Sequence, residues 1–205
     1  TLLRQNDLPM REISEIVLYL KSGFAAGSND QDNLSRRVIQ IRPTNIDEHG
    51  NLYFDRNIYL KEEFLEKKES ELLKKGEVLF NNTNSQELVG KSAYFDLEGD
   101  YFSSNHITRI KSDTSLINPF FLTLILNLYQ KSQVFYNICT NWNNQSGVNI
   151  DLLKSIPIPT PPLETQSDIV EEVEHRMAQA KQLQQEAQDV LAEAKRQVEN
   201  LIIPS

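Results

Sequence analysis

Clusters of amide, hydroxyl and basic side chains are the residues of this chain whose types and spacing best suit binding chemistry. They occupy residues 21–29, residues 81–85 followed by Lys91, residues 103–106 followed by Arg109, and residues 141–146. Asn and Gln can pair bidentately with adenine in the major groove of DNA, Arg and Lys pair with guanine, and Ser and Thr can hold phosphate oxygens. Because Asn and Ser also form turns, a structural role for each cluster is the alternative. The same holds for Trp142, since a lone Trp packs in a core more often than it stacks on a base.

The sequence lacks the residue patterns of a catalytic or metal site. Its histidines, His49, His106 and His175, do not have the spacing of metal ligands, and Cys139 is its single cysteine. No motif of an adenine methyltransferase or a nuclease is recognisable, and no glycine-rich segment is followed by the Lys-Ser/Thr pair of a phosphate-binding loop. We therefore predict a protein without catalytic residues, cofactor or metal, so that any reaction belongs to a partner.

Charge is unevenly distributed along the chain. The formal net charge is −8, and in residues 101–150 the three basic side chains outnumber the one acidic side chain. Since phosphate contacts need Lys and Arg, the chain alone should bind DNA weakly, and a partner would supply most of the positive surface. The longest apolar stretch, residues 120–128, is too short to cross a bilayer, and no signal peptide is recognisable. We predict a cytoplasmic protein with no membrane contact.

Apolar periodicity predicts an α+β domain followed by a long helix. Strands are expected at residues 37–43, 53–60, 78–80, 92–95 and 106–110. Helices are expected at residues 61–74 and 118–139. Residues 8–19 are expected to form a short helix or a helix that leads into a strand, and residues 149–156 a short turn or helix. The buried face of the 118–139 helix is expected to carry Phe121, Ile125, Leu128, Val134, Phe135 and Ile138. The prolines from Pro157 to Pro162 keep the next segment extended. We predict a globular domain over residues 1–160 and a spacer helix over residues 161–205.

The last helix carries an apolar stripe that its own domain is too small to cover. Steps of seven residues, with their flanking positions, place on this stripe Val173, Ala180, Leu183, Ala187, Leu191, Ala194 and Leu201. A stripe on a helix of about 33 residues, roughly 50 Å long, needs a partner helix, and its alanines let two backbones approach closely. The pattern predicts a coiled-coil homodimer, or pairing with the equivalent helix of another subunit. A lone solvated helix is the alternative.

Five short motifs follow one another along the chain. They are the runs Gly76–Ser85, Val89–Lys91, Ser104–Ile107, Asn141–Asn149 and Ile156–Gln166. In this order they resemble the target recognition domain and helical spacer of type I restriction-modification specificity subunits, which are also found fused to some adenine methyltransferase-restriction polypeptides. Each motif is weak alone, so the resemblance depends on all five occurring in the family's order over residues 10–201.

The resemblance implies a subunit that recognises double-stranded DNA and directs an adenine-N6 methyltransferase and restriction machinery to a target site. Family members usually carry two recognition domains and two spacers. This chain begins at Thr1 rather than Met and has length for one of each, so we expect a half-subunit or a piece of a longer polypeptide. The recognition tail of a fused methyltransferase-nuclease, and a coiled-coil module that does not bind DNA, are the alternatives.

The resemblance and the residue chemistry together assign DNA contact to thirteen side chains. These are Lys21, Ser22, Asn81, Asn82, Thr83, Asn84, Lys91, Asn105, His106, Arg109, Asn143, Asn144 and Gln145.

Overall fold

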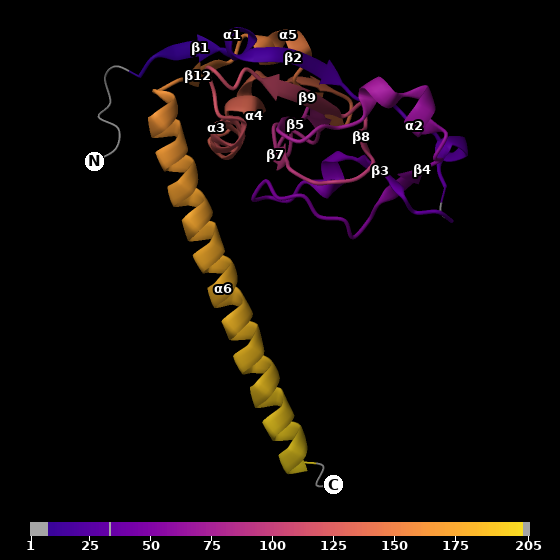
Figure 1. Ribbon diagram of the computed structural model, residues 1–205, viewed down its shortest axis with the longest axis vertical. Coiled ribbons are helices and arrows are strands. Elements are labelled where there is room, and N and C mark those ends of the chain that lie inside the picture. The colour runs from indigo at the N-terminus through magenta and orange to yellow at the C-terminus, as the bar shows by residue number, and fades with distance from the viewer. Residues whose placement is uncertain (1–7, 33, 203–205) are drawn as a thin grey trace. The chain divides into compact units, whose positions relative to one another are not determined.

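The structure, a computed structural model, describes residues 8–32 and 34–202 (Figure 1). The chain divides into two compact units, residues 1–166 and 167–205. The first unit combines small sheets with short helices, and the second belongs to a long helix, which confirms the predicted α+β class.

A four-stranded antiparallel sheet forms the centre of the first unit. Its strands follow the order β2 (Val17–Ser22), β9 (Ile107–Ser112), β5 (Glu77–Asn81) and β7 (Ser92–Phe95). Every residue of β5 is buried, because β9 and β7 flank this strand and the helices α3 (Pro119–Lys131) and α4 (Val134–Ile138) lie beside the sheet (Figure 1). The strands predicted at 78–80, 92–95 and 106–110 are therefore the three neighbours that carry the core.

A second, three-stranded sheet has the order β4 (Ile58–Leu60), β3 (Val38–Ile41) and β8 (Tyr101–Ser103). Its strands β3 and β4 are antiparallel, whereas β3 and β8 are parallel. One face of β3 contributes Ile41 to a cluster with residues of the central sheet, and the other contributes Val38 to a cluster around Phe102. Short 3-10 helices, η1 (Ser28–Asp30) and η2 (Pro43–Asn45), flank β3.

Two smaller sheets complete the first unit. The strands β10 (Thr140–Trp142), β11 (Gln145–Gly147) and β6 (Thr83–Asn84) form an antiparallel sheet in that order. The other sheet pairs β1 (Met10–Glu12) with β12 (Pro157–Pro159), so the proline segment is extended as predicted. The short helices α1 (Ile13–Ile16) and α5 (Ile150–Lys154) contact each other beside this pair (Figure 1).

The prediction of a charged helix at residues 61–74 is wrong. The segment contains only α2 (Phe64–Lys67) and the 3-10 helix η3 (Glu69–Glu71). The carbonyl oxygens of Glu71 and Leu72 accept hydrogen bonds from the Arg109 guanidinium, and the Leu73 amide donates to the Tyr101 carbonyl. These tertiary bonds replace the helical ones, and they place Leu72 and Leu73 against different apolar clusters.

The single helix predicted at 118–139 is interrupted. It begins as expected, because the Asn118 side chain accepts from the amides of Phe120 and Phe121. Gln133 then adopts a left-handed conformation with φ 61°, and α4 starts in a new rotational phase. As a result Ile138 of α4, predicted to be buried, is 37% exposed. Leu128, also predicted to be buried, is 55% exposed because Phe121, Leu122, Thr123 and Leu126 take the buried face of α3.

The chain ends in α6 (Leu163–Ile202), a single helix of 40 residues. Ion pairs and amide–carboxylate hydrogen bonds between side chains three or four residues apart, such as Arg176 with Glu172, support its exposed surface. Its first turn belongs to the first unit, because the buried Gln166 side chain accepts from the Asn118 amide and donates to the carbonyls of Leu116 and Pro161.

Candidate nucleic-acid interface

The amide-rich loop predicted at 141–149 is largely a β-hairpin. Trp142 pairs with Gln145 across β10 and β11, so Asn143 and Asn144 form its two-residue turn. Asn143 has φ 47°, in the left-handed region that Asn tolerates better than most residues with a side chain. Asn143, Asn144 and Gln145 are all exposed, so the hairpin presents three consecutive amide side chains to solvent.

Gly147 fixes the position of Trp142 on this hairpin. A Cβ atom at Gly147 would lie 2.5 Å from Cη2 of Trp142 and 3.1 Å from the carbonyl oxygen of Asn82, so there is no room for a larger residue. The indole is nevertheless 45% exposed. Trp142 therefore packs on the backbone through one part of its ring and leaves the rest at the surface, which differs from the expected core position.

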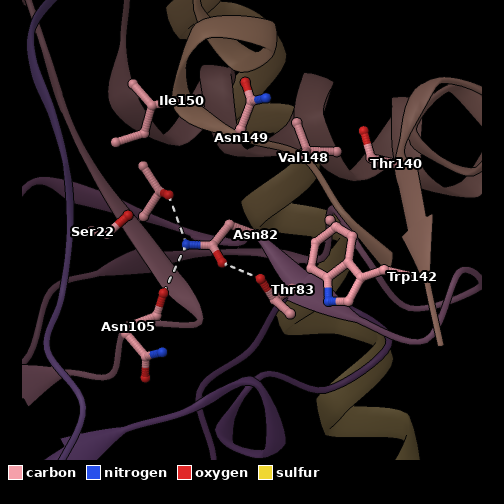
Figure 2. Close-up of a pocket in the computed structure, with 11 residues that line it drawn as sticks. Ser22, Asn82, Thr83, Asn105, Thr140, Trp142, Val148, Asn149 and Ile150 are labelled. Atoms are coloured by element: carbon pink, nitrogen blue, oxygen red, sulfur yellow. Dashed lines mark hydrogen bonds between the residues drawn. The ribbon is translucent and has the colours of Figure 1, made fainter. Parts of the chain in front are cut away.

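A cavity of about 330 Å³ lies beside the hairpin, on its β6 side (Figure 2). Side chains from β2, β9, β6, β10 and the start of α5 meet there, although they come from distant parts of the sequence. The lining is Ser22, Asn82, Thr83, Asn105, Thr108, Thr140, Trp142, Gly147, Val148, Asn149 and Ile150. It contains hydroxyls, amides, one indole and the apolar side chains of Val148 and Ile150 but no charged side chain, which suits contact with a neutral group that has both polar and apolar parts.

Asn82 organises this cavity. Its Nδ2 donates to the Thr108 hydroxyl at 2.9 Å and to the Asn105 carbonyl at 3.2 Å, while its Oδ1 accepts from the Thr83 hydroxyl at 2.8 Å (Figure 2). Its backbone carbonyl accepts from the Val148 amide. Since the side chain is 8% exposed and its amide is engaged at both ends, Asn82 holds β6, β9 and the segment after β11 together.

Arg109 lies far from solvent, in an ion pair with Glu77. The two side chains are 2% and 0% exposed, and Nη2 of Arg109 is 2.8 Å from Oε1 of Glu77. Arg109 also donates to the carbonyls of Glu71 and Leu72, both at 2.9 Å. The hydroxyl of Tyr19 donates to the same carboxylate, and burial together with this hydrogen bond raises the pKa of Tyr19 to about 12. With every direction occupied, Arg109 cannot reach a phosphate in this structure.

Asn81 and Lys91 are also engaged inside the fold. Asn81 is buried, and its Nδ2 donates to the Leu88 carbonyl at 3.0 Å. The ammonium of half-buried Lys91 donates to the Ile46 carbonyl, and desolvation lowers the Lys91 pKa against the opposing effect of Asp47. Both residues fasten loops to the central sheet.

The match to known proteins identifies the family. Residues 11–189 match the type I restriction modification DNA specificity domain. The chain belongs to this family. It is 27% identical over 167 residues to a Methanocaldococcus jannaschii protein described as a type I restriction enzyme MjaX specificity subunit, and the match covers 80% of this chain and 38% of that protein.

Solved structures of type I specificity subunits share the fold. The S subunit from M. genitalium has a TM-score of 0.58 at 13% identity, over 84% of this chain and 40% of that chain. The HsdS subunit from Thermoanaerobacter tengcongensis has a TM-score of 0.59 at 17% identity, over 88% and 40%. The chain therefore spans less than half the length of these relatives.

Within this type I specificity domain, the structure brings part of the expected site together. Ser22, Asn82, Thr83 and Asn105 line one cavity, and Asn143, Asn144 and Gln145 occupy the adjacent hairpin. Asn84 pairs with Ser146 of the hairpin, the His106 carbonyl accepts a hydrogen bond from the Asn82 backbone amide, and Lys21 lies exposed next to Ser22. Sequence reasoning did not select Thr140, Gly147 or Asn149, because only the strand pairing of β11 with β6 brings them to the cavity.

The described part of the chain contains neither a cluster of metal-ligating side chains nor a membrane-spanning helix. Residues 8–32 and 34–202 contain no group of three or more His, Cys, Asp or Glu side chains placed to hold a metal ion. Over the same residues, no helix combines the length and apolarity needed to span a bilayer.

Proposed function

We propose that this chain recognises a double-stranded DNA sequence through its first unit and acts as one half of a type I specificity assembly. The observation that carries the proposal is the hairpin of exposed amides beside an uncharged cavity, in a chain whose residues 11–189 match the DNA specificity domain. The wide major groove of B-DNA admits a two-stranded β-ribbon. A hairpin that carries Asn143, Asn144 and Gln145 has the side chains that pair with adenine edges.

The other exposed residues of this surface would bind different parts of the DNA. Ser22 and Asn105, which line the cavity, would bind base edges or sugar-phosphate oxygens, and the exposed Lys21 would bind phosphate. Asn81, Asn82, Lys91 and Arg109 hold the loops that carry these groups, so they support recognition without contact to DNA.

Methylation and cleavage belong to partners in this proposal. The chain would direct an adenine-N6 DNA methyltransferase and the restriction machinery to the site. Because the net charge is −8, the partner would supply much of the positive surface that faces phosphate. The isolated chain is therefore expected to bind DNA weakly.

The second recognition unit would come from another copy of the chain or from the rest of a longer polypeptide. The stripe on α6 leaves Met177, Leu183, Val190, Leu191 and Val198 exposed, and the alanines of the stripe are exposed as well. A long helix with such a stripe gains stability by burying it against another helix. We propose an antiparallel pair of α6 helices, which would set the distance between two half-sites.

Mapping of methylated adenines tests the proposal. A host strain that expresses the chain with its methyltransferase should carry methyl groups at one sequence motif, and the double change Asn144→Ala and Gln145→Ala should relax one position of that motif. Lys154→Ala, an exposed change on α5, serves as the control. An unaltered motif in the double variant rules out the hairpin as the reader, and methylation that does not depend on the chain rules out the function.

A further inference from the structure

Three chain segments run parallel at one edge of the first unit and end side by side. The pairing of β3 with β8 aligns Ile41 with Ser103, and the Ser104 amide donates to the Ile41 carbonyl at 2.9 Å. Phe24, which follows β2 and Gly23, forms a parallel bridge with Ser104 on the other side. The next position in this register places Arg42 beside Ser104.

The Arg42 guanidinium has no counter-charge. Its Nε is buried without a hydrogen-bond partner, and Nη2 makes only a long contact of 3.4 Å to Oε1 of Gln40. Among residues 8–32 and 34–202, no carboxylate lies within ion-pair distance of Arg42. Arg37, by contrast, pairs with Glu62 and Asp100. A partly desolvated cation without a partner is costly, so this site favours the arrival of an anion.

Neighbouring groups hold Arg42 in place and add polar atoms. Gln40 is fully buried, and its Nε2 donates to the Phe24 carbonyl at 2.9 Å, which leaves Oε1 directed to Arg42. The hydroxyls of Ser103 and Ser104 are buried at the same strand ends, and neither has a hydrogen-bond partner. Gly23 lets this arrangement form, because a Cβ there would lie 2.0 Å from the Ser103 carbonyl oxygen.

The same segments lead directly to the hairpin cavity. Asn105, which lines the cavity, follows Ser104, and Ser22, which also lines it, precedes Gly23. Adjacent strands lie about 4.8 Å apart, so Arg42 is one strand and one residue away from Asn105. An arginine side chain at that separation reaches a group that flanks whatever occupies the cavity.

We infer that Arg42 binds a backbone phosphate of DNA that flanks the bases read by the hairpin and cavity. This inference rests on the proposed function. Guanidinium groups match phosphate oxygens bidentately, and a phosphodiester supplies the single negative charge that the site lacks. Arg42 thereby fixes the register of the duplex against the hairpin without reading a base itself.

Salt-dependent DNA binding of the full chain tests the assignment, since a phosphate contact needs no cognate sequence. The probe is a fluorescein-labelled duplex of random sequence, followed by fluorescence anisotropy over a series of NaCl concentrations. Arg42→Gln should lower the slope of log K against log [NaCl] by about 0.9, the value for one phosphate contact, and Arg42→Lys should retain the slope. Arg37→Gln removes the same charge from a residue that already has carboxylate partners and should change the slope less.

Thermal unfolding provides a second test, because a structural role of Arg42 predicts a lower unfolding midpoint in Arg42→Gln, whereas a phosphate-binding role does not. Because Arg42→Gln removes an uncompensated charge, its midpoint should equal or exceed that of the wild type in the absence of DNA. An unchanged slope in Arg42→Gln, or a lowered midpoint in the absence of DNA, overturns the inference while leaving the proposed function intact. Wild-type protein that shows no salt-dependent DNA binding overturns the proposed function instead.

Discussion

Arg109 of β9 and Glu77 of β5 form a buried ion pair in which Nη2 lies 2.8 Å from Oε1. We predict that Arg109→Met lowers the free energy of unfolding by about 3–5 kcal/mol, because it leaves the buried Glu77 carboxylate without its counter-charge. The double change Glu77→Met and Arg109→Met should cost less than Arg109→Met alone. Urea unfolding measures all three proteins, and exposed Lys21→Met serves as the control, with an expected change within about 0.5 kcal/mol. A stable Arg109→Met protein with weakened DNA binding would contradict this structural role.

The sequence reveals the strand that contains Arg109 but not its partner. A basic residue three positions after a polar cluster has the same local signature whether it faces DNA or the core. Its environment depends on the pairing of β9 with β5, which lies about thirty residues earlier and brings Glu77 within reach. For the same reason Lys91 and Asn81 were predicted to contact DNA, since the groups that bind them are far away in the sequence or in the next loop.

Tyr19 donates to the same carboxylate, and this contact predicts a pH dependence. Desolvation and the Glu77 hydrogen bond raise the Tyr19 pKa from 10.0 to about 12. The protonated phenol is therefore favoured by folding, and its contribution to stability is fully present below pH 10 and is lost as the pH rises towards 12. Tyr19→Phe should be less stable than the wild type below pH 10, and the difference should shrink through that window. Urea unfolding at a series of pH values checks this, and a constant difference contradicts it.

Local patterns predicted the strands better than the helices. The residues of β5, β7 and β9 alternate with polar loops in a way that only a buried sheet satisfies. The 61–74 segment has helical composition, but its carbonyls bind Arg109, and no local pattern reports such a bond. The hairpin shows the same limit, because its turn is readable from Asn143-Asn144 whereas its place beside Asn82 depends on the pairing of Gly147 with Thr83.

Changes at Asn82 and Gln145 distinguish a residue that supports the fold from a residue that reads a base. Asn82→Ala removes the donor to buried Thr108 and should lower the free energy of unfolding by about 1–3 kcal/mol. Gln145→Ala changes an exposed side chain and should leave stability nearly unchanged, but it should reduce the preference for one base by about 1–3 kcal/mol. Competition between cognate and scrambled duplexes, with the methyltransferase present, measures the preference. Equal loss of cognate and scrambled binding in Gln145→Ala would show that this side chain does not read a base.

The two alanines Ala187 and Ala192 lie on different faces of α6 and provide a matched test of helix pairing. Ala187 is in the apolar stripe, whose last residue, Leu201, has a side chain that the structure does not describe. Ala187→Asp would place a charge between two closely packed backbones, so we expect it to convert a dimer to a monomer. Ala192→Asp adds the same charge to the same helix, but five residues further along and away from the stripe, so it should leave the dimer intact. Sedimentation velocity of the wild type and both variants at equal concentration distinguishes them. A wild-type chain that sediments as a monomer rules out a homodimer and leaves pairing with another subunit's helix, whereas dissociation of both variants alike would place the contact elsewhere than on the stripe.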